Sequence, residues 1–282
     1  KSIPAMSYKV FYIEEGNQGS ISTNLKADTE NECIENEYFK ITFAEDGTIS
    51  SMYDKVNQYE MVDSSADCKF NQYNYYGEYG PFAIDHNNLD QITEVHHYAP
   101  SKAQIFITEA SNYVRAEVIT SCKYASYIRQ TVTLYEGIDR VDIKNEVVRD
   151  NLPSIKTKEE AFYVMPFALS DNFDIYHDTP NGYISPTNID TDVITGSCTD
   201  FYTVNKWVAL VDNNTGYNIM VTLPDTALMQ YGERRTNEWA FDYEPEKPYL
   251  YSYVMNNQWY TNFQGEQPGY ASFSYSISTS KS

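Results

Sequence analysis

Hydrophobic and polar residues alternate along most of this chain with a period of two. In the range 140–150, for example, the alternate positions are held by Val141, Ile143, Asn145 and Val147. Successive side chains of a strand point to opposite faces, so the alternation predicts strands that place one face in a core. The predicted strands span residues 8–13, 38–43, 48–53, 92–99, 103–110, 112–121, 124–135, 140–150, 161–169, 205–212, 217–223, 249–255 and 270–278.

Turn-forming residues separate the predicted strands. Asp46-Gly47 lies between two of them and predicts a tight hairpin. No helical period persists for three turns. The pattern predicts an all-β fold, built as a large sandwich of antiparallel sheets. We expect residues 1–32 to form a linking strand and a polar connector, and residues 33–282 to form the sandwich domain.

The amino-acid composition favours strands and limits the partners. Tyrosine alone accounts for 27 of the 282 residues, and tyrosine is typical of strands. Asp and Glu number 40 against 20 Lys and Arg, which gives a formal net charge of −20. Such a surface repels phosphate backbones and anionic lipids, so neither nucleic acid nor a membrane surface is an expected partner. No apolar run approaches the roughly 20 residues that a membrane-spanning helix needs.

The cysteines and the first residues bear on processing and compartment. The four cysteines lie far apart and contain no C-x-x-C pair, which argues against a zinc ribbon; they are Cys33, Cys68, Cys122 and Cys198. Free thiols are favoured over disulfides, because a domain of this size needs no covalent staple. The chain opens at Lys1 rather than Met, so we expect a processed or excised piece. The acidic, Asn- and Tyr-rich composition favours an exported bacterial protein, with the cytoplasm as the alternative.

The histidines do not predict a metal site. His96 and His97 are adjacent in a predicted strand, so their side chains point to opposite faces and cannot share one ion. His86 lies in a polar loop, and His177 stands beside Asp178 near a strand end. Solvated histidines are commoner at such positions than ligands or catalytic bases. We therefore predict no metal ligands in this chain.

Acid–base chemistry on a sugar needs two carboxylates at a set separation. Glu159 and Glu160 are the most suggestive pair, because they precede an apolar predicted strand. A solvated strand entry explains them more simply. The sequence contains no G-x-S-x-G elbow, phosphate-binding loop or dinucleotide fingerprint, which argues against those chemistries.

Clusters of aromatic and amide side chains carry more functional information. Residues 70–76 contain three tyrosines and three amides, and residues 234–239 place two arginines close to a tryptophan. Flat rings cover the apolar faces of sugars, while amides and guanidinium groups bind their hydroxyls. Ordinary packing in a tyrosine-rich sandwich remains the alternative explanation.

One stretch resembles a known family. Residues 256–263 read Asn-Asn-Gln-Trp-Tyr-Thr-Asn-Phe, which resembles the N-N-x-W-x-T-N-[FY] segment of glycoside hydrolase family 38 α-mannosidases, bacterial ones in particular. Further stretches resemble that family's sandwich half in the same order: 3–8, 34–39 followed by 46–55, 158–167 and 205–208. The resemblance covers almost the whole chain.

The resemblance implies a β-supersandwich of the galactose-mutarotase-like type, C-terminal to a catalytic barrel and a helical bundle. It also implies that the parent enzyme cleaves α-mannosides with an Asp nucleophile and a zinc ion, both belonging to the barrel. None of the barrel's motifs occurs in this chain. We therefore expect a non-catalytic domain with no cofactor of its own, whose partners are the barrel, the bundle and a mannoside.

The resemblance also suggests which residues approach the sugar. The sandwich of such enzymes lends side chains to the rim of the active site, and the rim candidates are Tyr75, Tyr76, Arg234 and Arg235. The family segment contributes Asn256, Asn257, Trp259 and Asn262, as structural or sugar-contacting residues. Two alternatives stay open: an independent carbohydrate-binding module, and an aldose epimerase on the same fold. The epimerase would need His96 or His177 to face a carboxylate in a cleft.

Overall fold

The computed structural model of the chain describes residues 3, 6–12, 22–79, 93–150, 158–235, 240–257 and 268–282. Strands dominate this described part, and its single α-helix is the four-residue α1 (Ile189–Asp192). None of its helices is long and apolar enough to cross a membrane. The predicted all-β fold is confirmed.

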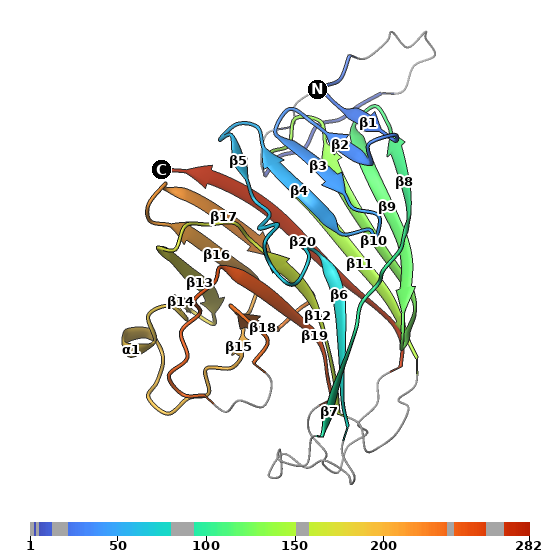
Figure 1. Cartoon of the computed structure of the whole chain (residues 1–282). Helices are drawn as coiled ribbons and strands as arrows, with labels where there is room; N and C mark the ends of the chain where they lie inside the picture. Colours follow the sequence, from blue (N-terminus) through green and yellow to red (C-terminus); the bar gives the residue numbers. More distant parts are fainter. Residues whose placement is uncertain are drawn as a thin grey trace.

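A nine-stranded sheet forms the larger layer of the molecule, and its neighbouring strands are all antiparallel. It runs across the whole view in Figure 1. Its strands, in spatial order, are β14 (Gly182–Ile184), β13 (Phe173–Thr179), β16 (Trp207–Asp212), β17 (Tyr217–Thr222), β20 (Gly269–Lys281), β11 (Val141–Arg149), β10 (Ala125–Tyr135), β9 (Tyr113–Cys122) and β8 (Gln104–Glu109).

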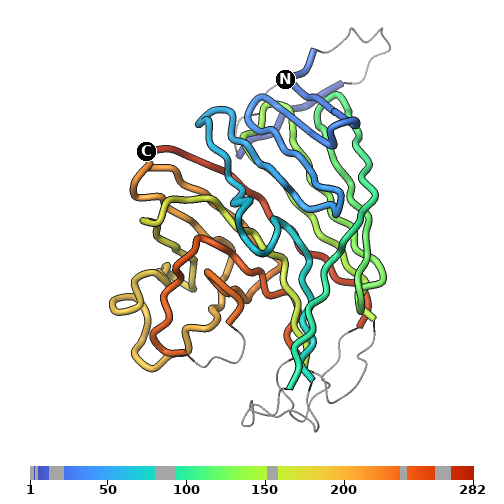
Figure 2. The backbone as a smooth tube through the Cα atoms, viewed as in Figure 1, coloured from blue at the N-terminus to red at the C-terminus, as the bar shows by residue number. Residues whose placement is uncertain are grey.

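Two smaller antiparallel sheets pack against this layer, the five-stranded one in the upper part of the view and the six-stranded one below it (Figures 1 and 2). The five-stranded sheet contains β1 (Lys26–Asp28), β2 (Cys33–Glu35), β3 (Phe39–Phe43), β4 (Ile49–Asp54) and β5 (Tyr59–Glu60). The six-stranded sheet contains, in spatial order, β15 (Tyr202–Thr203), β18 (Leu228–Tyr231), β19 (Tyr249–Asn257), β12 (Lys158–Pro166), β6 (Gln72–Tyr79) and β7 (Glu94–Tyr98).

The core lies between the layers and follows from the period of two. In β11, Val141, Ile143, Asn145 and Val147 are all buried. Asn145 is tolerated there because its side chain exchanges two hydrogen bonds with the buried amide of Asn71, at 3.1 and 2.7 Å. A buried amide is costly unless it is satisfied in this way.

The six-stranded sheet has an inner face towards the nine-stranded sheet and an outer face on the opposite side. Ala161 and Tyr163 of β12 belong to the inner face, where they pack in one cluster with Ile128 and Val147 of the larger sheet. Their neighbour Phe162 packs in a separate cluster on the outer face. All nine residues of β12 are buried, so both faces of this central strand are covered.

Most strand predictions are confirmed, with shifts of a few residues at the ends, but the first one is wrong. Residues 8–12 form no strand, and their large side chains are exposed, with Tyr8 89% exposed. Alternation alone does not make a strand where no partner strand supplies hydrogen bonds. Eight strands were not predicted, because they are short or carry many polar residues: β1, β2, β5, β6, β13, β14, β15 and β18.

Candidate functional site

The strongest concentration of charge and aromatic rings lies on the outer face of the six-stranded sheet. Arg234, just after β18, donates from Nη2 to Glu78 Oε1 at 2.5 Å and from Nε to Glu160 Oε1. Tyr253 donates its hydroxyl to Glu160 Oε2 at 2.9 Å. We call this group the outer-face cluster; its members are Tyr76, Glu78, His97, Glu160, Arg234 and Tyr253.

The strand register brings the cluster together. Glu160 of β12 stands opposite Tyr76 of β6, and Tyr76 in turn stands opposite His97 of β7. Residues that face each other across neighbouring antiparallel strands share one face of the sheet. Glu78 lies two residues from Tyr76 and therefore projects to the same face. Three strands thus supply side chains to one patch.

Burial makes the ion pairs of this cluster strong. Glu160 is fully buried and Glu78 is 2% exposed, while the side chain of Arg234 is 23% exposed. Burial lowers the pKa of Arg234, but the carboxylates of Glu160 and Glu78 outweigh it and raise that pKa overall. The guanidinium therefore stays charged, and it offsets two buried carboxylates that would otherwise be very costly.

Tyr76 lies between a cation and an imidazole. The Cζ atom of Arg234 lies 4.5 Å from the centre of the Tyr76 ring, and the His97 ring stacks on Tyr76 at 4.5 Å with an interplanar angle of 13°. Partial burial and then Arg234 lower the pKa of His97, so its ring is neutral at pH 7.

The hydrogen bonds of His97 determine its tautomer. Asn74 donates from Nδ2 to the carbonyl of Gln72 at 3.0 Å, which leaves its Oδ1 as the acceptor that faces His97 Nε2 at 2.8 Å. The neutral ring must then carry its proton on Nε2 and offer Nδ1 as an acceptor. Together with the guanidinium donors and a flat ring, this acceptor suits a ligand rich in hydroxyl groups.

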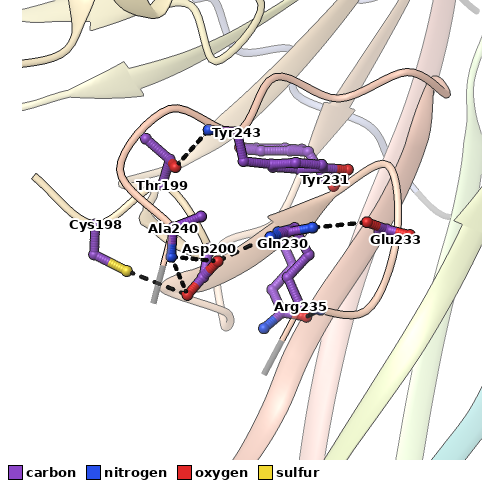
Figure 3. A network of polar contacts seen from close by, with 9 residues as sticks. All are labelled: Cys198, Thr199, Asp200, Gln230, Tyr231, Glu233, Arg235, Ala240 and Tyr243. Atoms are coloured by element: carbon purple, nitrogen blue, oxygen red, sulfur yellow. Dashed lines mark hydrogen bonds and ion pairs between the residues drawn. The ribbon is translucent and has the colours of Figure 1, made fainter. Parts of the chain in front are cut away.

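The second arginine belongs to a different network, shown in Figure 3. Arg235 stacks on Tyr243 with Cζ 3.8 Å from the ring centre, and its guanidinium pairs with Asp200 at 3.3 Å and Glu233 at 2.8 Å. Asp200 also accepts from the backbone N–H of Ala240. This network ties the segment after β18 to the one before β15, and it is separate from the outer-face cluster.

Tyr75 projects to the inner face, opposite to Tyr76. It is 2% exposed, and its hydroxyl donates to Glu159 Oε1 at 2.5 Å. Asn257 donates to the same carboxylate at 3.5 Å, and Asn256 stands opposite Glu160 in the register. Of the rim candidates, the structure therefore brings only Tyr76 and Arg234 together.

Several predicted residues lie outside the described residues: Trp259, Asn262 and His86. The remaining histidines are placed clearly. His96 and His97 point to opposite faces, as predicted, and His96 Nε2 lies 2.8 Å from Glu94 Oε2 on the inner face. His177 is fully buried between Tyr202 and Tyr231. Within the described residues no three His, Cys, Asp or Glu side chains gather as metal ligands.

The structure also places the four cysteines and the pair Glu159 and Glu160. All four cysteines are free thiols, as favoured from the sequence. Glu159 and Glu160 are not solvated; both are buried, on opposite faces of β12. The simpler explanation of a solvated strand entry is therefore wrong, because β12 is the central strand between β6 and β19.

Sequence reasoning missed three members of the outer-face cluster: Glu78, His97 and Tyr253. A signal for Glu78 was available, since a strand through 72–79 places Asn74, Tyr76 and Glu78 on one face. No sequence pattern pointed to Tyr253, because its approach to Glu160 depends on pairing between β12 and β19, about 90 residues apart in the chain.

Comparison with protein families gives one match. Residues 34–223 match the family described as glycosyl hydrolases family 38 C-terminal domain. No curated protein matches the chain.

Solved structures share the fold at low sequence identity. An α-mannosidase from Enterococcus faecalis V583 has a TM-score of 0.60 and 9% identity, and covers 94% of this chain and 30% of its own. A glycosyl hydrolase family 38 protein from Enterococcus faecalis has a TM-score of 0.63 and 10% identity, and covers 95% and 32%. A galactose mutarotase-like protein from Lactobacillus casei ATCC 334 has a TM-score of 0.49 and 10% identity, and covers 88% and 99%. The chain spans about a third of the length of the two Enterococcus proteins.

Proposed function

The chain belongs to the glycosyl hydrolases family 38 C-terminal domain family, and from this premise we propose that it is the non-catalytic β-sandwich of an α-mannosidase. In this proposal the domain packs against a separate catalytic region and presents the outer-face cluster to the mannoside. Tyr76, His97 and Arg234 contact the sugar, and Glu78 and Glu160 position Arg234.

One observation carries the proposal: a charged guanidinium is fixed by two carboxylates above an aromatic ring on one sheet face. The ion pairs hold Arg234 in a single orientation, which reduces the conformational entropy lost on binding. The same pairing argues against catalysis by these residues, because Glu78 and Glu160 are both committed to Arg234. A nucleophile or a general acid needs a carboxyl group that faces the substrate.

The N-terminal segment supports docking to another region. Residues 6–12 expose a run of large apolar side chains: Met6, Tyr8, Val10, Phe11 and Tyr12. Contiguous apolar exposure of this kind is typical of surfaces that another protein region covers. In this proposal the catalytic region is what covers it.

Zinc, which the resemblance implies for a complete α-mannosidase, is proposed to be held by the catalytic region. The donor set of the outer-face cluster does not fit zinc, because its two carboxylates already pair with Arg234 and its imidazole Nε2 pairs with Asn74. The contribution of this chain is binding and support.

Histidine-selective NMR tests the sugar contact. The chain has only four histidines, so each labelled ring can be assigned by single substitutions. Added methyl α-D-mannopyranoside should shift the His97 ring signals, with an affinity in the millimolar range (about 4 kcal/mol). Arg234→Lys should weaken the effect about tenfold, since lysine keeps the charge but loses the planar fork.

The matched control is Arg115→Lys. Arg115 also lies over a tyrosine ring, with Cζ 4.7 Å from the centre of Tyr113, but on the nine-stranded sheet. This exchange should leave the His97 response unchanged. A His97 ring that does not respond to the mannoside would refute the sugar contact.

A further inference from the structure

A pocket lies on the other side of the six-stranded sheet from the outer-face cluster, between the edge strand β7 and the turn that joins β9 to β10. It has a volume of about 560 Å³, within the usual range of small-molecule sites. Its lining residues are Tyr79, Thr93, Glu94, His96, Tyr98, Lys123 and Tyr124. None of them belongs to the outer-face cluster.

Two tyrosine rings form the apolar walls of this pocket. The rings of Tyr98 and Tyr124 are nearly perpendicular, at 86° with their centres 6.1 Å apart. The buried ring of Tyr75 backs both of them, 6.1 Å from Tyr98 and 5.2 Å from Tyr124. A sugar ring has apolar C–H faces and edges, and this aromatic corner offers a flat surface to them.

The polar groups at the rim carry both signs of charge. Lys123 Nζ lies above the rings of Tyr98 and Tyr124, at 4.7 and 5.1 Å, and donates to Tyr98 Oη at 3.1 Å. His96 Nδ1 lies 3.1 Å from the same hydroxyl, and His96 Nε2 lies 2.8 Å from Glu94 Oε2. Glu94 disfavours an anion and Lys123 disfavours a cation, so a neutral ligand rich in hydroxyl groups fits best.

The backbone of Tyr124 adds an independent observation. Lys123 and Tyr124 form the two-residue turn between β9 and β10, and Tyr124 has φ of 63°. This left-handed conformation favours Gly or Asn, and it costs a residue such as tyrosine about 1 kcal/mol or more. Backbone strain of this kind is concentrated at functional positions, where the surrounding structure holds the side chain in place despite the conformational cost.

We propose that this pocket is a carbohydrate subsite that holds one neutral sugar ring against Tyr98 and Tyr124, with Glu94 and Lys123 binding its hydroxyls and His96 positioning Glu94. It lies on the opposite face of the sheet from the outer-face cluster, because His96 and His97 project in opposite directions. Sugar binding at this subsite can therefore be tested separately from the proposed sugar contact at Arg234. It would hold a sugar unit away from the site of cleavage.

The adjacent histidines distinguish the two sites in one experiment. With ring-labelled histidines, methyl α-D-mannopyranoside should shift the His96 signals as this pocket fills and the His97 signals as the outer-face cluster binds. A response of His97 alone overturns the subsite and leaves the proposed function intact. Mannose 6-phosphate should bind no more tightly than the neutral sugar at His96, because Glu94 repels its phosphate and offsets the attraction of Lys123; preference for the phosphorylated sugar would overturn the assignment to a neutral ligand.

Tyr124→Asn is the decisive variant. Asparagine accepts the left-handed backbone, so the turn should fold, and loss of the ring should weaken the His96 response about tenfold. Unchanged His97 signals in the free protein verify that the sheet is intact. Tyr127→Ala removes an exposed tyrosine near the start of β10, the strand that follows the turn; it is the control and should bind normally. Full binding by Tyr124→Asn would overturn the subsite.

Discussion

His177 shows how strongly burial controls single polar residues in this fold. Its ring is fully buried, stacks on Tyr231 with an interplanar angle of 16°, and lies 3.0 Å from the Tyr231 hydroxyl through Nδ1. Burial lowers the pKa of His177 from 6.5 to about 4, against a smaller opposing effect of Asp178. The imidazole is therefore neutral at pH 7, and in this setting it is a packing residue rather than an acid–base catalyst.

This residue predicts a loss of stability in acid. In the unfolded chain His177 becomes protonated below pH 6.5, whereas in the folded chain it stays neutral down to about pH 4. The full free energy of unfolding is therefore present above pH 6.5. As the pH falls towards 4, protonation of His177 in the unfolded chain lowers this free energy by up to about 3 kcal/mol. Urea unfolding at pH 7 and pH 4.5 should show that His177→Phe loses less stability than the wild-type chain. Equal losses in the two proteins would contradict this account.

Sequence reasoning was accurate for single residues inside regular strands. The period of two correctly placed His96 opposite to His97, and Tyr75 opposite to Tyr76. The period of two could not predict that Arg234 and Arg235 belong to different networks, because both lie after the end of β18 and outside any regular period. Their partners come from β6, β12 and the segment around Asp200, and such long-range contacts leave no local pattern.

At the scale of elements, Asp54 joins the five-stranded sheet to the nine-stranded one. It ends β4, and its Oδ2 accepts from Tyr217 of β17 at 2.9 Å and Thr279 of β20 at 2.6 Å. Its Oδ1 accepts the backbone N–H groups of Val56 and Asn57. Burial raises the pKa of Asp54, but the hydrogen bonds from the side chain and backbone of Asn57, and then those from Thr279 and Tyr217, outweigh it and keep the pKa below its usual value.

The chain contains a matched control for this junction. Asp28 makes the same local turn, accepting from the backbone of Glu30 and Asn31 and from the side chain of Asn31, but among the described residues it has no hydrogen bond to another sheet. Asp54→Ala should destabilise the fold by about 3–5 kcal/mol, since it leaves buried donors without a charged acceptor. Asp28→Ala should cost clearly less. Equal effects in chemical denaturation would show that the inter-sheet bonds add nothing.

The sequence predicted the long strands with regular alternation. It missed the very short strands, which are defined only by their hydrogen bonds to a neighbouring strand. The strands β9 and β11 have ten and nine residues and alternate regularly, so the sequence predicted them well. The three-residue β1, by contrast, was assigned to the connector, because its strand character comes from its register with β2.

At the scale of the whole molecule, the sandwich is a scaffold with two distinct polar sites on one sheet. The outer-face cluster and the aromatic pocket lie on opposite faces of the six-stranded sheet, while the nine-stranded sheet supplies the largest share of the main core cluster. The family match and the two Enterococcus structures support the sandwich fold. The central claim is that such a domain supports and positions a substrate, while a separate catalytic region performs the cleavage.

The most direct test measures hydrolysis of 4-nitrophenyl α-D-mannopyranoside by the purified chain, with and without added Zn²⁺. The account predicts no turnover above the uncatalysed rate in either condition, because Glu78 and Glu160 are committed to Arg234 and the described residues bring together no set of zinc ligands. Robust zinc-dependent release of 4-nitrophenol by this chain alone would contradict the claim that it is the non-catalytic part of the enzyme.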